Sequence, residues 1–149
     1  MQWWIFSGQE ISLVIKLLGS LLAGVLIGLE REYRGKSAGI STYSMVIGGA
    51  MIFTALSIHA DPNSPARIAA QIVSGVGFLG AGMILVGQGE KVKNLTTAAG
   101  LWFAAAIGMS IGFDWYLLAG VATLYCIVVP RIPHAKQAEN KAPTAEIIK

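Results

Sequence analysis

Side chains capable of acid–base, nucleophilic or metal chemistry are few in this sequence, and they do not cluster. The two histidines, His59 and His134, lie far apart, and the single cysteine, Cys126, lies in an apolar run. The pattern holds no pair of carboxylates, no Cys–His pair and no serine beside a general base, which are the arrangements that catalysis uses. The sequence therefore predicts that the protein is not an enzyme, with no catalytic residues, no cofactor and no metal site.

One glycine motif has a chemical interpretation that we reject. Gly75-x-Gly77-x-x-Gly80 matches the dinucleotide-binding fingerprint, but that site needs a preceding strand and a following acidic residue. Here the glycines lie in an uncharged run that begins after Arg67 and continues to Gly87. As a helix, this run of about 20 residues would span ~30 Å, the thickness of a bilayer's hydrocarbon core. We therefore interpret the glycines as a helix-packing surface in a membrane.

The composition agrees with a membrane protein. Of the 149 residues, 54% are hydrophobic and 13% are charged, and soluble domains carry about 25% charged residues. The predicted fold is all-α, a polytopic membrane bundle of five transmembrane helices within residues 1–132. The five spans are expected at residues 11–29, 41–58, 68–87, 95–113 and 115–132, with Pro130 and Arg131 cutting into the fifth. The polar tail at residues 133–149 is expected to be disordered and cytoplasmic.

Lysines and arginines in the short loops predict the orientation, because cytoplasmic loops carry an excess of both. Most of the eleven basic residues fall on one side of the predicted bundle: Arg31, Arg34, Lys36, Lys91, Lys93, Arg131, Lys136, Lys141 and Lys149. The N-terminus is then expected outside and the C-terminus in the cytoplasm. Because these charges lie at membrane edges and not in one patch, the net charge of +3 does not indicate nucleic-acid binding.

The first predicted span carries a stripe of polar and small residues. Intervals of three and four place these on one helical face: Lys16, Ser20, Ala23, Ile27, Glu30 and Arg34. Gly24 and Gly28 continue an adjoining row of small residues that would let another helix approach closely. Either this face packs inside the bundle, or it lines a polar pathway or regulatory site. Lys16 lies near the outer edge and is expected to reach the interface.

The third predicted span also carries polar residues on one face, namely Arg67, Gln71 and Ser74. A charge within a span costs free energy, so Arg67 is expected to be paired. Asp61, Asp114 and the carbonyls of neighbouring helix ends are the candidate partners. A structural ion pair and an ion- or ligand-sensing role both stay open for Arg67.

The charged stretch at residues 30–36 is expected to end the first span. Glu30 with Arg34, and Glu32 with Lys36, have the i,i+4 spacing of favourable ion pairs, and Gly35 then ends the helix. This stretch is either a solvated helix end or a docking surface for a protein or for anionic headgroups.

Asn94 is the expected N-cap of the fourth span, and the threonines that follow it are expected to bond locally. The candidate functional or packing residues are Glu30, Arg31, Arg34, Gly35, Lys36, Arg67, Gln71, Ser74, Gly75, Gly77, Gly80, Gly82, Asn94, Thr96 and Thr97.

Four sequence blocks, in this order and spacing, resemble the MgtC/SapB family of bacterial inner-membrane proteins. They are residues 28–32 (GLERE), 34–39 (RGKSAG), 67–82 (RIAAQIVSGVGFLGAG) and 95–99 (LTTAA), and the likeness covers residues 11–129. The resemblance implies a five-helix membrane domain in the bacterial plasma membrane, the inner membrane of a Gram-negative cell. It also implies a link to magnesium homeostasis and growth in low magnesium.

The same resemblance implies a regulator that binds other membrane proteins, with the F-type ATP synthase as the named candidate. Two blocks depart from the family pattern: Ser64 stands where many relatives have an acidic residue, and residues 39–43 lack an arginine and a histidine. The alternative function is a small-ion transporter or channel built by an oligomer, with Glu30, Arg67 and Gln71 lining a path. The expected partners are therefore the bilayer and other membrane proteins, with self-association left open and no nucleic acid.

Overall fold

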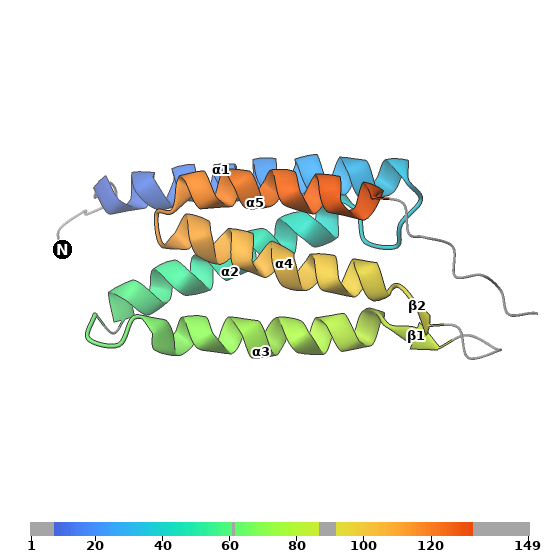
Figure 1. Cartoon of the computed structure of the whole chain (residues 1–149). Helices are drawn as coiled ribbons and strands as arrows, with labels where there is room; N and C mark the ends of the chain where they lie inside the picture. Colours follow the sequence, from blue (N-terminus) through green and yellow to red (C-terminus); the bar gives the residue numbers. More distant parts are fainter. Residues whose placement is uncertain (1–7, 61, 87–91, 133–149) are drawn as a thin grey trace, which may run out of the picture.

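The computed structural model describes residues 8–60, 62–86 and 92–132, and in these ranges the chain folds into a bundle of five helices (Figure 1). The helices are α1 (Gly8–Tyr33), α2 (Ile40–Ala60), α3 (Ala66–Met83), α4 (Leu95–Gly112) and α5 (Tyr116–Val128). The first four are long and apolar enough to cross a membrane. The predicted all-α polytopic bundle is thus confirmed.

The fifth helix is shorter than the span that the sequence predicts. α5 ends at Val128, and one 3₁₀ turn, η1 (Val129–Arg131), follows it. Pro130 explains the change, because proline cannot donate the backbone hydrogen bond that would continue an α-helix. At about 1.5 Å per residue, residues 116–131 reach ~24 Å, less than the roughly 30 Å hydrocarbon core.

The third predicted span is too long at its C-terminal end. α3 ends at Met83, and Ile84 is already extended. β1 (Leu85–Val86) then pairs antiparallel with β2 (Val92–Lys93), Leu85 opposite Lys93. Strands of two residues are too short to show a period-two pattern, so the sequence did not reveal them. Gly87 and the predicted tail at residues 133–149 lie outside the described residues.

Helices α2 and α4 form the centre of the bundle. α1 and α5 lie side by side against this pair, and α3 packs on its other side (Figure 1). The core runs between α1, α2 and α4, where these apolar side chains are almost fully buried: Ile27, Ile47, Met51, Leu101 and Ile107.

Close approach of α1 to α2 depends on two glycines in the predicted small-residue row. A Cβ atom on Gly24 would overlap the backbone of Ser44, and one on Gly28 would overlap the backbone of Ile40. The polar stripe on α1 lies inside the bundle as well, since Ser20 and Glu30 are buried. The face of α1 therefore packs against the bundle, which is the first of the two interpretations of this stripe.

Helix α4 also approaches α2 closely through two glycines, which were not among the predicted candidate residues. A Cβ on Gly108 would overlap the Ile47 carbonyl, and one on Gly112 would lie 2.6 Å from the Thr54 Cβ. These two glycines are four residues apart and share one face of α4. The central pair of helices is therefore held at backbone contact over at least one turn.

The helices alternate in direction, so the charged loops gather at the two ends of the bundle (Figure 1). We call one of these the basic end; it holds the loop after α1, the β1–β2 pair and the end of α5. Of the predicted basic residues, those described at this end are Arg31, Arg34, Lys36, Lys93 and Arg131. The first and last described residues lie at opposite ends, as an odd number of helices requires. Lys91, Lys136, Lys141 and Lys149 lie outside the described residues.

Candidate functional site

Arg31 is a charged side chain buried inside the basic end. Only 2% of it is exposed, and its Nη2 donates a 2.8 Å hydrogen bond to Thr97 Oγ1 on α4. Its Nε has no hydrogen-bond partner among the described residues. The threonine therefore bonds across the bundle, which corrects the expectation that it bonds locally. A buried charge needs polar partners, so this contact stabilises the pairing of α1 with α4.

Glu30 joins the ends of α1 and α5. Its Oε1 accepts hydrogen bonds from Arg34 Nη1 and from Arg131 Nε, both at 3.3 Å. Arg34 Nη1 also donates to the Pro130 carbonyl at 2.8 Å. The predicted Glu30–Arg34 pair is confirmed. Arg131 was not among the predicted site residues, although its place directly after the last span at the basic end was a usable signal.

The loop after α1 is fixed by backbone hydrogen bonds around Gly35. This glycine has φ +62°, its N–H donates to the Glu32 carbonyl at 2.9 Å, and Lys36 N–H donates to the Arg31 carbonyl at 3.0 Å. This is a Schellman ending, and it confirms Gly35 as the residue that ends the helix.

Glu32 caps the start of the next helix, because its Oε1 accepts a 2.9 Å hydrogen bond from Ile40 N–H. The expected Glu32–Lys36 pair is not among the ion pairs of the described residues. The Glu32 carboxylate thus binds a backbone N–H in the first turn of α2 instead of Lys36. This N–H has no hydrogen-bond partner within its own helix. One side chain thereby links the end of α1 to the beginning of α2.

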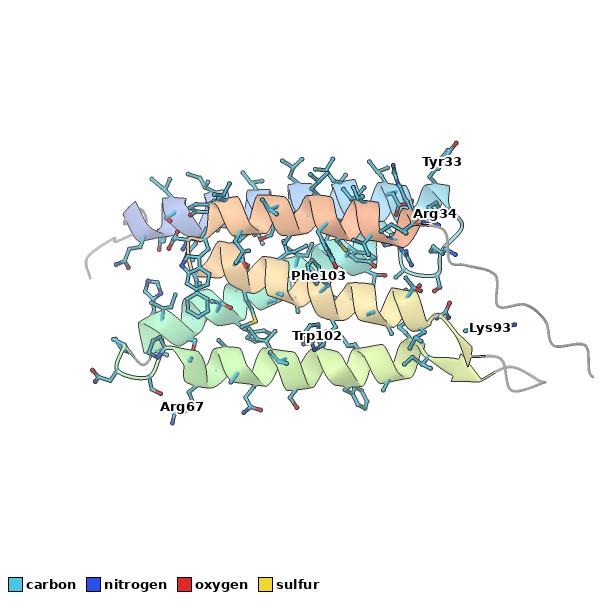
Figure 2. The ribbon with its side chains drawn as sticks, viewed as in Figure 1. Tyr33, Arg34, Arg67, Lys93, Trp102 and Phe103 are labelled. Carbon is cyan, nitrogen blue, oxygen red and sulfur yellow. The ribbon has the colours of Figure 1, made fainter. Side chains whose placement is uncertain are left out.

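These contacts surround a small polar pocket of about 210 Å³, which we call the basic pocket. It is lined by Arg31, Arg34, Lys36, Thr96, Pro130, Arg131 and Ile132. Figure 2 shows Arg34 at this end of the bundle, together with Lys93 of β2. The lining contains four cationic side chains and no acidic one.

Asn94 precedes α4, at the position that the sequence predicts for its N-cap. It takes φ +64°, a conformation that asparagine tolerates better than most residues, but its side chain makes no capping bond. Asn94 therefore occupies the predicted N-cap position, but the expected hydrogen bond between its side chain and the helix is absent. A left-handed backbone at this residue turns the chain from β2 into α4.

The opposite end of the bundle is closed by Lys16. Its side chain is buried, and its Nζ donates to Asp114 Oδ2 at 2.9 Å and to the Gly112 carbonyl at 3.1 Å. Lys16 therefore ties α1 to the α4–α5 turn, which corrects the expectation that it merely reaches the interface. Tyr116 also donates to Asp114, and this bond, followed by that from Lys16, lowers the pKa of the Asp114 carboxyl.

The carboxylate of Asp114, one of the two acids proposed as a partner of Arg67, is thus bound by Lys16 and Tyr116. Arg67 lies at the same end, and Figure 2 shows it on the outer side of α3. Asp61, the other proposed partner, lies outside the described residues.

Most of the predicted glycine motif faces away from the bundle. Of the glycines in α3 only Gly80 is buried, and a Cβ there would lie 3.8 Å from Ala98 Cβ. A Cβ on Gly75, Gly77 or Gly82 would meet nothing within 4 Å. These three glycines therefore do not pack helices together within this chain, because α3 lies at the edge of the bundle and contacts it by one face. The spacing of the glycines could not tell which face that would be.

An open apolar groove of about 470 Å³ lies between α2 and α3. We call it the α2–α3 groove; its lining includes Gly49 and Ala50 from α2 and Gln71, Gly75 and Leu79 from α3. A Cβ on Gly49 or Gly75 would meet nothing within 4 Å, so the helix backbone itself is open to a neighbour at both positions.

The residues of the transport alternative are not brought together in one chain. Glu30 is buried at the basic end, whereas Arg67 lies exposed at the opposite end and Gln71 lines the α2–α3 groove. A path lined by all three would need several chains.

The five helices and their charged ends define a polytopic membrane protein. The model of the MgtC family matches residues 17–136, and the chain belongs to this family. It is 47% identical to Protein MgtC of Salmonella typhimurium (strain LT2) over 131 residues, which is 87% of this chain and 56% of the relative. It is 46% identical to Protein MgtC of Brucella abortus (strain 2308) over 114 residues, 76% of this chain and 48% of that protein. The chain thus spans about half the length of these relatives, and no solved structure matches it significantly.

Proposed function

We propose that this chain is a regulator in the bacterial plasma membrane, the inner membrane of a Gram-negative cell, that binds another membrane protein through the α2–α3 groove. The observation that carries the proposal is the open backbone at Gly49 and Gly75, on the two helices that line this groove. In a bilayer, helices associate chiefly by close packing, and small residues allow that approach. A groove in which a glycine on each wall leaves the helix backbone open therefore fits an incoming transmembrane helix.

The chemistry of the groove supports the same proposal. Its lining is apolar apart from Gln71, a side chain able to donate and accept a hydrogen bond. Interhelical hydrogen bonds of this kind add to packing in membranes, each by about 0.6 to 2 kcal/mol. Gln71 and Ser74, both among the candidate residues predicted from the sequence, are exposed on α3. They would contribute such hydrogen bonds to a partner.

The proposed orientation follows from the basic end. Loops rich in lysine and arginine stay in the cytoplasm, so this end faces the cytoplasm and α1 begins outside. From the family resemblance we propose a role in adaptation to low magnesium and the F-type ATP synthase as the partner. A transmembrane helix of the partner would fill the groove and pack against its apolar lining.

Growth under magnesium limitation tests the role. A strain whose own family member is deleted would be complemented with the wild-type chain, Gly75→Leu or Gly120→Leu. Both glycines are helical positions with open space around them, but Gly120 lies on α5 in a different groove, so it is the matched control. We expect wild type and Gly120→Leu to restore growth and Gly75→Leu to fail at equal membrane abundance. If all three chains restore growth, the α2–α3 groove is not needed for the function.

A second measurement tests the partner. In inverted membrane vesicles, overexpressed wild-type chain should lower ATP-driven proton pumping, and Gly75→Leu should leave pumping near its uninhibited rate. If pumping is unchanged by the wild type while growth is still restored, the partner is a different membrane protein.

A further inference from the structure

The basic pocket holds positive charge that its own lining does not compensate. Four cationic side chains line it, and Glu30, whose carboxylate contacts two of them, is not part of the lining. One oxygen of Glu30 is already shared between Arg34 and Arg131. Among the ion pairs of the described residues, Glu30 therefore pairs with Arg34 and Arg131, and Arg31 and Lys36 have no carboxylate partner.

One residue that lines the pocket also has a buried donor without an acceptor. Arg31 is 2% exposed, lines the pocket, and has an Nε–H without a partner in the described part of the chain. Buried polar groups are nearly always hydrogen-bonded, so an unpartnered one calls for a ligand or an ordered water. Arg31 already donates a hydrogen bond from Nη2 to Thr97. Its remaining N–H groups would bind an anionic acceptor more strongly than a neutral one, because charge-assisted hydrogen bonds are stronger.

The size of the pocket limits what it would hold. Its volume of about 210 Å³ is below the roughly 300–1,000 Å³ of pockets for drug-sized ligands. It nevertheless exceeds by far the space that one water needs. Arginine forks match the geometry of phosphate oxygens, lysine binds phosphate as a point charge, and the Thr96 hydroxyl adds a neutral donor.

We propose that the basic pocket binds a phosphate group at the end of the bundle. Two sources share this chemistry: the headgroup of an anionic phospholipid and inorganic phosphate. Basic pockets between transmembrane helices recognise lipid headgroups in this way. The bound phosphate would accept from Arg31 and hold the ends of α1 and α5 together, next to the Glu30 contacts. The site is separate from the α2–α3 groove and does not depend on the proposed function.

Two binding measurements on the purified full chain in an uncharged detergent separate the sources. In the first, inorganic phosphate is titrated at constant ionic strength, with chloride as the replacing anion, and the melting temperature is recorded. In the second, native mass spectrometry counts retained phosphatidylglycerol and phosphatidylcholine. A saturable rise in melting temperature with phosphate assigns the pocket to free phosphate. Selective retention of phosphatidylglycerol, without that rise, assigns it to the headgroup.

Lys36→Gln is the discriminating variant, because Lys36 is exposed, lines the pocket and forms no side-chain ion pair within the described ranges. We expect about tenfold weaker phosphate or phosphatidylglycerol binding, the loss of one charge-assisted contact, with Lys36→Arg near wild type. Lys93→Gln is the matched control: an exposed lysine at the same end that does not line the pocket. The proposal is overturned if neither ligand binds, or if Lys36→Gln and Lys93→Gln weaken binding equally.

Discussion

At the scale of single residues, the bond between Arg31 and Thr97 is the side-chain contact at the basic end whose two residues are both almost fully buried. Removing one partner of a buried charged hydrogen bond leaves the other without an acceptor, which costs about 1.5–3 kcal/mol. Thr97→Val keeps the shape of the side chain and removes the hydroxyl. We therefore predict a loss of unfolding free energy of that size, measured by denaturation in mixed detergent micelles.

The control for this prediction is Thr96→Val. Thr96 is the neighbouring threonine on α4, but it is exposed and accepts no hydrogen bond from Arg31. With no phosphate or anionic lipid in the sample, its loss should change stability by less than about 0.5 kcal/mol, as most exposed substitutions do. If the two variants lose the same unfolding free energy, the hydrogen bond between Arg31 and Thr97 does not contribute to stability.

Asp114 gives the molecule a dependence on pH at the opposite end. Hydrogen bonds from Tyr116 and Lys16 lower its pKa in the folded protein. A carboxyl with a lowered folded pKa stabilises the fold fully above its unfolded pKa, about 3.9, and this contribution is lost as the pH falls through the folded pKa. Wild type should therefore be more stable than Asp114→Asn at neutral pH, and the difference should shrink below about pH 4.

Asparagine is the suitable replacement because Asp114 has φ +65°, which asparagine also tolerates. Thermal unfolding of both proteins from neutral pH to about pH 3 is the measurement. A difference in stability that grows on acidification would contradict the assignment.

At the scale of elements, the α1–α2 contact requires glycine at Gly28. A Cβ there would overlap the Ile40 backbone, which cannot move aside as a flexible side chain could. We predict that Gly28→Ala lowers the unfolding free energy by about 1–3 kcal/mol, the usual cost of overpacking. Gly19→Ala on the same helix is the control, because the space around Gly19 is open.

Gly19→Ala should be neutral or stabilising, by up to roughly 1 kcal/mol in a helix. Unfolding of the two variants side by side, in one detergent, checks the prediction. Equal stability of both would mean that α1 and α2 separate without cost.

The sequence was sufficient for features that depend on local chemistry. The five helices, the end of α1 at Gly35 and the placing of the Lys16–Glu30 stripe on one face of α1 all follow from periodicity and turn residues that act within one segment. The packing of α1 through Gly24 and Gly28 was predictable for the same reason.

Features that depend on distant parts of the chain were not predictable. Arg131 reaches Glu30, and Arg31 reaches Thr97, only after the helices have been placed beside each other. The glycines of α3 were predicted to form a helix-packing surface, but only Gly80 meets the bundle, because which face of α3 packs depends on α2 and α4. The β1–β2 pair is too short to leave a pattern.

At the scale of the whole molecule, charge and apolar surface are divided between the ends and the flanks. Polar contacts close both ends, through Lys16 with Asp114 at one and Glu30 with Arg34 and Arg131 at the other. The flank formed by α2 and α3 leaves glycine backbone open in the α2–α3 groove. Such a bundle is held together at its ends by ion pairs and leaves helix backbone open along one side, which suits the regulator proposed above.

Photo-crosslinking within living cells tests this account most directly. p-Benzoylphenylalanine would replace Leu79, which lines the α2–α3 groove, or Leu124, an exposed residue of α5 outside it. We predict a discrete adduct of the Leu79 protein with a second, different membrane protein, lost in the Gly75→Leu background, and none from Leu124. Identical adducts from both positions, or Leu79 adducts only with another copy of this chain, would contradict the proposal that the groove binds a partner.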